Sequence, residues 1–209
     1  MLELEQSNLE ADMKLANTNT DWGAPAKIFH WLVAAAVLVL LAHGWWMTHM
    51  APRPERIANY AWHAALGYDL LVLMVLRLLW RLSQPVPALP ADSRPWERLA
   101  ATLGHWLLYG LLLADALVGW ALVGTMRTPL RLDLFGLPFP QIYGSGGLFS
   151  HGQLEDTHRV LAYALAVLVA VHVAGALRHH FIKRNSVMRR MLWRSEPSML
   201  HYAEQGGRK

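Results

Sequence analysis

The chain has 209 residues, of which 54% are apolar and only 16% are charged, against about 25% charged residues in ordinary soluble domains. It contains no cysteine, which excludes disulfides, iron–sulfur clusters and any thiolate or thioether attachment of a cofactor. The net charge of +4 does not indicate nucleic-acid binding, because the basic residues lie beside apolar segments, where membrane topology explains them. Length and composition together predict one membrane domain with short tails.

The two ends of the chain are predicted to be tails. Residues 1–14, MLELEQSNLEADMK, hold four acidic residues and one lysine, so they do not resemble the basic start of a signal peptide. We expect residues 1–24 to be a disordered tail and residues 195–209 to be a second tail. The domain itself is expected over residues 25–194.

Four stretches are apolar over about 20 residues, the length needed to cross a bilayer as a helix. They cover residues of about 26–50, 60–82, 96–124 and 155–181. The stretches are too long for strands and lack two-residue alternation, and Pro25 suits a first helical position. The sequence therefore predicts an all-α integral membrane protein, a four-helix bundle.

The connections between the predicted spans differ in character. Residues 51–59 form a short link, and residues 83–95 carry four prolines, which prevents a continuous helix. Residues 125–154 form a longer loop rich in Gly and Pro, and loops of this length are often functional.

The basic residues predict an orientation in the membrane. Of the 19 lysines and arginines, fourteen fall on the side of the two termini, and the other side holds Arg53, Arg56, Arg127, Arg131 and Arg159. The excess of positive charge marks the cytoplasmic side. Both termini are therefore expected on the cytoplasmic side of the membrane.

Two histidines in the fourth span lie at different depths. His158 and His172 are fourteen residues apart, which is a rise of about 21 Å and a rotation of about 40°, so they share one face of the helix. His30 opens the first span near the cytoplasmic side, level with His172. His63 opens the second span on the opposite side, level with His158.

The four histidines therefore form two pairs, an inner pair (His30 and His172) and an outer pair (His63 and His158). Haem b fits each pair best, because imidazole binds haem iron from either side and a non-covalent porphyrin suits an apolar bundle. A lone histidine near a helix end is usually interfacial, and a zinc site needs more ligands than one pair offers. Ionisable residues within membranes are costly and usually functional, so we predict two haems b ligated by these histidines.

Three further residues are predicted near the inner haem. His105 lies in the third span at the inner depth, where it is a candidate for contact with a haem propionate or a quinone. Arg77 and Arg81 lie at the same depth on the face of the second span that carries His63. Guanidiniums there suit propionates, although anchoring at the cytoplasmic end explains them as well.

His43 and Gly67 are not expected to bind haem iron. His43 follows His30 by thirteen residues but points about 220° around the helix, so it is expected to be a packing or surface histidine. Gly67 follows His63 by one turn and serves either close approach of a porphyrin or helix packing.

Several motifs carry a resemblance to a known family. They are KIFHWLVAA around His30, AWHAALGYDLLVLMVLRLLWRL around His63, LGHWLLYGLLL around His105, LEDTHRVLAYAL around His158 and AVHVAGALRHHFIKRNSVMRRML around His172. In their order and spacing the chain resembles the bacterial cytochrome b561 family of di-haem membrane cytochromes, over roughly residues 25–194. The resemblance implies two six-coordinate b haems with His30, His63, His158 and His172 as axial ligands. It also implies electron exchange with a membrane quinone, and superoxide oxidation at the periplasmic face is one activity known in the family.

The expected function is electron transfer across the membrane between the outer and inner haems. Ubiquinone is the expected substrate at one end, and superoxide or a periplasmic redox partner is the expected donor at the other, which would make the protein an electron-transfer oxidoreductase. If superoxide is the donor, the outer arginines should form a basic funnel for the anion. Two alternatives are a membrane-anchor cytochrome b subunit of a dehydrogenase or hydrogenase, and a haem-free transporter or assembly protein.

Overall fold

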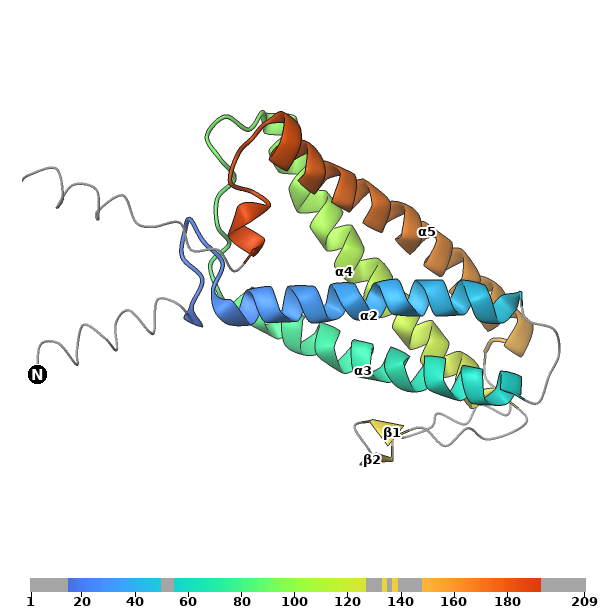
Figure 1. The fold of residues 1–209 in the computed structure, drawn as a ribbon. Coiled ribbons are helices and arrows are strands. Elements are labelled where there is room, and N and C mark those ends of the chain that lie inside the picture. The colour runs from blue at the N-terminus through green and yellow to red at the C-terminus, as the bar shows by residue number, and fades with distance from the viewer. Residues whose placement is uncertain (1–14, 50–54, 127–132, 135–136, 139–147, 193–209) are drawn as a thin grey trace, which may run out of the picture.

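Four long helices form the protein. The computed structural model describes residues 15–49, 55–126, 133–134, 137–138 and 148–192. The helices are α2 (Ala24–Thr48), α3 (Glu55–Ser83), α4 (Pro95–Gly124) and α5 (His151–Leu177), as Figure 1 shows. Two short strands, β1 (Asp133–Leu134) and β2 (Leu137–Pro138), pair antiparallel near one end of the bundle. The all-α four-helix bundle is confirmed.

Polar capping turns extend the helices beyond the predicted apolar stretches. The Oγ of Ser150 accepts a hydrogen bond from the backbone N–H of Gln153 at 3.3 Å, and the Oε1 of Gln153 accepts one from the N–H of Ser150 at 2.9 Å. This reciprocal pair is a capping box, and it starts α5 at His151 rather than near residue 155. Pro25 lies in the first turn of α2, as predicted.

The helices differ in how well they suit a bilayer. Within the described residues, three helices are long and apolar enough to cross a membrane, namely α2, α4 and the helical stretch His151–Ile182. The helix α3 is 29 residues long but carries Asp69, Arg77 and Arg81, and it is not among those three, so its crossing stays a prediction. Large apolar side chains such as those of Leu38 and Val167 point outward, with 58% and 65% of their surface exposed. Such an apolar exterior is typical of a membrane surface.

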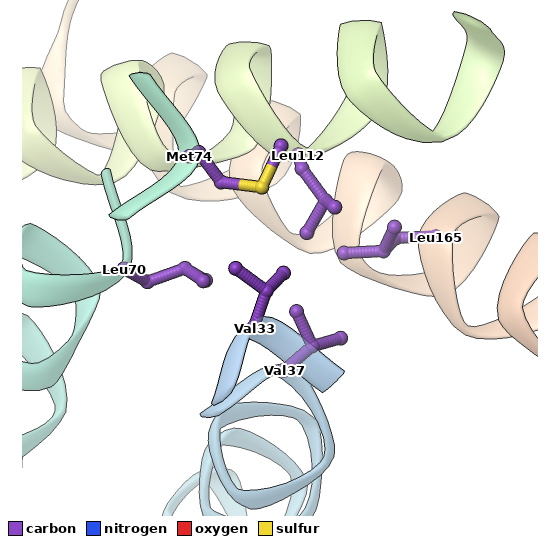
Figure 2. Packing of buried hydrophobic residues seen from close by; sticks show 6 residues of the cluster. All are labelled: Val33, Val37, Leu70, Met74, Leu112 and Leu165. Atoms are coloured by element: carbon purple, nitrogen blue, oxygen red, sulfur yellow. The ribbon is translucent and has the colours of Figure 1, made fainter. Parts of the chain in front are cut away.

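The bundle core lies between the two histidine depths. Figure 2 shows the side chains that meet there from all four helices, Val33, Val37, Leu70, Met74, Leu112 and Leu165. Leu165 is seven residues from His158 and seven from His172. An apolar layer therefore separates the two ends of the bundle.

The packing of the backbones is uneven around the bundle. The closest pairs of helices are α4 with α5, α2 with α3, and α3 with α4. The backbone of α5 approaches α4 more closely than it approaches α2 or α3 in the described part of the chain. Side chains must therefore bridge a wider space between α5 and the helices that carry His30 and His63.

Three segments cover the end of the bundle from which α2 begins. Residues 15–23, 84–94 and 183–192 are joined there by hydrogen bonds, and we call them the terminal cap. The Asn17 Nδ2 donates to the carbonyl of Pro85 at 3.1 Å, and the Asn17 Oδ1 accepts from the N–H of Gly23 at 2.9 Å. The indole N–H of Trp31 donates to the carbonyl of Met191 at 2.9 Å.

Part of the predicted N-terminal tail is ordered in the terminal cap. Residues 15–23 fall within the predicted disordered tail, yet Asn17 and Asn19 are hydrogen-bonded to residues 84–88, and Asn17 is only 6% exposed. The tail expectation was wrong for these residues because polar side chains such as Asn17 bond to partners distant in sequence. Residues 1–14 and 195–209 lie outside the described residues.

Candidate functional site

The structure brings the four predicted histidines together as two pairs. The ring centres of His30 and His172 are 6.2 Å apart, with planes at 61°. Those of His63 and His158 are also 6.2 Å apart, with planes at 83°. Helix α5 supplies one histidine to each pair, at positions separated by a rise of about 21 Å. The pairing inferred from depth is thus observed, while the role of these residues as ligands stays a prediction.

The spacing within each pair fits a metal held between two imidazoles. Each ring nitrogen lies about 1.2 Å from the ring centre, given ordinary bond lengths, and a metal–imidazole bond is about 2.0–2.1 Å. Two imidazoles on opposite sides of one metal ion therefore place their ring centres on the order of 6.4 Å apart. Both observed distances agree with that value. The pairs also span the helices whose backbones lie farther apart, where a bulky group is best accommodated.

At the outer site, Asp115 of α4 contacts the Nδ1 of His158. The Nδ1 of His158 lies 2.7 Å from the Asp115 carboxylate and donates to the backbone carbonyl of Asp115 at 3.2 Å. A metal-binding histidine usually gives its other N–H to such an acceptor, which leaves Nε2 for the metal. The Asp115 side chain is only 13% exposed, so the contact is shielded from water.

Glycines lie against both outer imidazoles. A Cβ on Gly44 of α2 would lie 3.3 Å from the Cε1 of His63, and a Cβ on Gly119 of α4 would lie 3.2 Å from the Cε1 of His158. A Cβ at either position would therefore be unusually close to an imidazole, and glycine allows the ring to pack against the helix backbone. For Gly67, no described atom lies within 4 Å of an added Cβ, which favours open space over helix packing as the reason for that glycine.

His43 also belongs to the outer site. Its ring centre lies 5.7 Å from that of His63, with planes at 20°, and 4.7 Å from that of Trp62. Its Nδ1 is buried and has no hydrogen-bond partner in the described ranges. The expectation of a packing histidine that points away from His30 is confirmed, and this direction brings the His43 ring against α3.

The inner site contains two of the three other predicted residues. The Arg77 Nη2 donates to the Nδ1 of His30 at 3.0 Å, and the ring centre of His105 lies 5.5 Å from that of His172. The Arg81 guanidinium instead lies over the ring of Trp22, 5.3 Å from its centre, in the terminal cap. Their contacts with propionates or a quinone stay predictions.

Sequence reasoning missed Asp115, and a signal for it was present. Asp115 is an ionisable residue within an apolar span, ten residues after His105. Such residues inside membranes are costly and by default indicate function. Gly44 and Gly119 gave no comparable signal, since glycine is common in membrane helices.

Comparison with known proteins decides the family. The model of the prokaryotic cytochrome b561 family matches residues 21–194. The chain belongs to the prokaryotic cytochrome b561 family.

The b561 relatives cover most of this chain. It is 32% identical to cytochrome b561 homolog 2 of Escherichia coli (strain K12) over 193 residues, which is 88% of this chain and 97% of that protein. It is 28% identical to the probable superoxide oxidase CybB of Yersinia pestis over 170 residues, or 78% of this chain and 90% of that protein. Cytochrome b561 homolog 1 of Escherichia coli (strain K12) is 25% identical over 171 residues, or 78% of this chain and 92% of that protein.

Membership of the b561 family confirms the resemblance seen in the motifs. The protein is a bacterial membrane cytochrome of the b type, which places it among electron-transport proteins that bind haem. The expectation of a haem-free transporter or assembly protein is therefore unsupported. The two histidine pairs stay the predicted ligands of b-type haem in this chain.

Proposed function

We propose that the protein carries electrons across the bacterial inner membrane through two b haems. His63 and His158 would hold the outer haem, and His30 and His172 the inner one. The observation that carries the proposal is the pair of equal separations, 6.2 Å between ring centres at each end of the bundle. When bound, haem b supplies one-electron redox chemistry, and the protein supplies position and electrostatics.

The residues of each pair suit electron transfer better than binding of a substrate to iron. The two imidazoles of each pair would together hold one haem iron and would leave it no open position for a substrate. Between the two sites, the apolar layer around Met74 and Leu165, which are 1% and 3% exposed, excludes water and ions. Electrons can tunnel across such a layer, whereas charged solutes pay a large desolvation penalty.

Arg77 is proposed to contact a propionate of the inner haem. In the structure its guanidinium donates to the Nδ1 of His30. An imidazole that binds metal through Nε2 carries its proton on Nδ1 and no longer accepts a hydrogen bond. Arg77 then needs another acceptor, and carboxylates are the acceptors that guanidiniums bind best. His105 is proposed to contact a propionate or a quinone at the same site.

The proposed electron partners are a donor at the outer side and a membrane quinone. Superoxide is the proposed donor, because one relative is named a probable superoxide oxidase. Ubiquinone is the proposed acceptor, on the family resemblance. The excess of Lys and Arg on the side of the termini supports a cytoplasmic location for both.

Haem content tests this proposal directly. The purified protein should contain two b haems per chain in a pyridine haemochrome assay. Replacing His172 with Ala should remove the inner haem and leave about half of the haem, because the partner His30 alone cannot complete the site. The matched control is His49→Ala, which changes an exposed histidine whose Nδ1 bonds to the carbonyl of Trp45 in α2 and should keep both haems. Full haem content in His172→Ala, or an equal loss in His49→Ala, would show that the pairing is wrong.

A further inference from the structure

We propose that Asp115 lowers the reduction potential of the outer haem through His158 and thereby directs electrons from the outer site to the inner one. This inference rests on the proposed function, since it needs a haem at each histidine pair. It assigns a positioning role to a residue of α4, the helix that supplies neither member of either pair.

The geometry places two groups of α4 against the His158 ring. The Asp115 carboxylate is 2.7 Å from Nδ1, and its backbone carbonyl accepts from Nδ1 at 3.2 Å. One helical turn later, Gly119 lies against the Cε1 of the same ring. The Nδ1–H is therefore directed at Asp115, which leaves Nε2 for a metal.

The Nδ1 atoms of His63 and His30 have different surroundings from that of His158. The Nδ1 of His63 is buried and has no hydrogen-bond partner among the described residues. The Nδ1 of His30 faces the Arg77 guanidinium at 3.0 Å. The outer site thus has a carboxylate behind one ligand, whereas the inner site has a cation behind one ligand.

These charges act on the potentials in opposite directions. The Asp115 backbone carbonyl that accepts the Nδ1–H makes the imidazole a stronger electron donor through Nε2. The negative charge of the Asp115 carboxylate, 2.7 Å from Nδ1, favours the more positive, oxidised state of a nearby iron. The Arg77 guanidinium at the inner site favours the reduced state by the same rule, and its proposed pairing with a propionate reduces this effect, so the difference between the two sites rests mainly on Asp115. One electron that leaves the outer site and arrives at the inner site therefore moves toward higher potential, with no proton transferred between Asp115 and His158.

The test is a spectroelectrochemical titration of the purified two-haem protein and of Asp115→Asn. Asparagine keeps the size and an oxygen acceptor but removes the charge. The outer midpoint potential should shift upward and the inner one should stay, so that the gap between them narrows. The component missing from His172→Ala identifies the inner haem. Electron paramagnetic resonance of the oxidised protein should show changed g-values for the outer haem only.

The matched control is Asp156→Asn, which removes an exposed carboxylate two residues before His158 that is paired with Arg159. It should leave both potentials unchanged. An unmoved outer potential in Asp115→Asn, an equal shift of both haems, or an equal shift in Asp156→Asn would overturn the inference.

A second variant covers loss of the outer haem in Asp115→Asn. Asp115→Glu keeps the carboxylate and should retain the haem at a potential near that of the unchanged protein. Loss of the outer haem in both variants would mean that shape matters and charge does not, which overturns the inference. An unchanged protein without two b haems would instead overturn the proposed function.

Discussion

At His158 the contacts of a single imidazole come largely from one neighbouring helix. Asp115 bonds to its Nδ1 and Gly119 lies against its Cε1. A ring held on two sides in this way has little freedom to move. The orientation of this imidazole is therefore set before any group binds to its Nε2, which is how precise metal sites are usually built.

Replacing Gly119 with Ala should disturb the outer site specifically. The new Cβ would lie 3.2 Å from the His158 Cε1, so the ring must move by a few tenths of an ångström against its bond to Asp115. We expect reduced outer haem content and an altered reduced-minus-oxidised spectrum. The control is Gly110→Ala on the same helix, where a Cβ meets no described atom within 4 Å and haem content should be normal. Equal haem content in both variants would contradict this account.

At the scale of elements, the end of α5 is fixed by the start of α4. The Glu97 carboxylate, 5% exposed, accepts from Arg178 at 2.8 Å and from Lys183 at 2.6 Å, and it also accepts from the N–H of Arg94 at 2.8 Å. There α5 passes into a π-helical turn, Arg178–Ile182. Because His172 lies six residues before Arg178, this cluster helps to set the depth of the inner histidine.

The terminal cap yields a prediction at the same scale. Asn17→Ala removes two side-chain hydrogen bonds and leaves the Gly23 N–H and the Pro85 carbonyl without their partner. Such a loss costs about 1–3 kcal/mol, so limited proteolysis within residues 15–23 should become roughly 5- to 150-fold faster. The control is Asn19→Ala. The Asn19 side chain is exposed, and the residue is joined to Ala88 through its backbone carbonyl, which the substitution keeps. Equal cleavage rates in the two variants would exclude a structural role for Asn17.

For the whole molecule, the distribution of charge bears on the electron donor. On the outer side, the Arg159 side chain is paired with Asp156, which weakens it as a guide for an anion. The side chains of the other four outer arginines, Arg53, Arg56, Arg127 and Arg131, lie outside the described residues. A basic funnel for superoxide therefore stays a prediction.

Rapid mixing of the oxidised protein with superoxide tests the donor. Haem reduction should be fast and should slow as ionic strength rises, because salt screens the attraction between an anion and a basic surface. The control is the same mixing after superoxide has been removed by dismutation, which should leave the haems oxidised. Haems that stay oxidised in the presence of superoxide would remove it as the donor.

Most of the fold and the two histidine pairs could be predicted from the sequence. Apolar stretches of about 20 residues predict membrane helices. Four long helices were found near the predicted positions, and three of them are long and apolar enough to cross a membrane within the described residues. The depth of a residue along a helix depends only on its position in the chain, since each residue adds about 1.5 Å. That local rule was enough to place His158 with His63 and His172 with His30.

The tertiary structure decided which faces of the helices meet. His43 was correctly predicted to point away from His30, but the sequence does not say that this face of α2 meets α3, where His43 packs on Trp62 and His63. Asp115 reaches His158, and Asn17 reaches Pro85, for the same reason. Periodicity and rise are properties of one helix and can be read from its residues, whereas contacts between helices depend on how all four pack together.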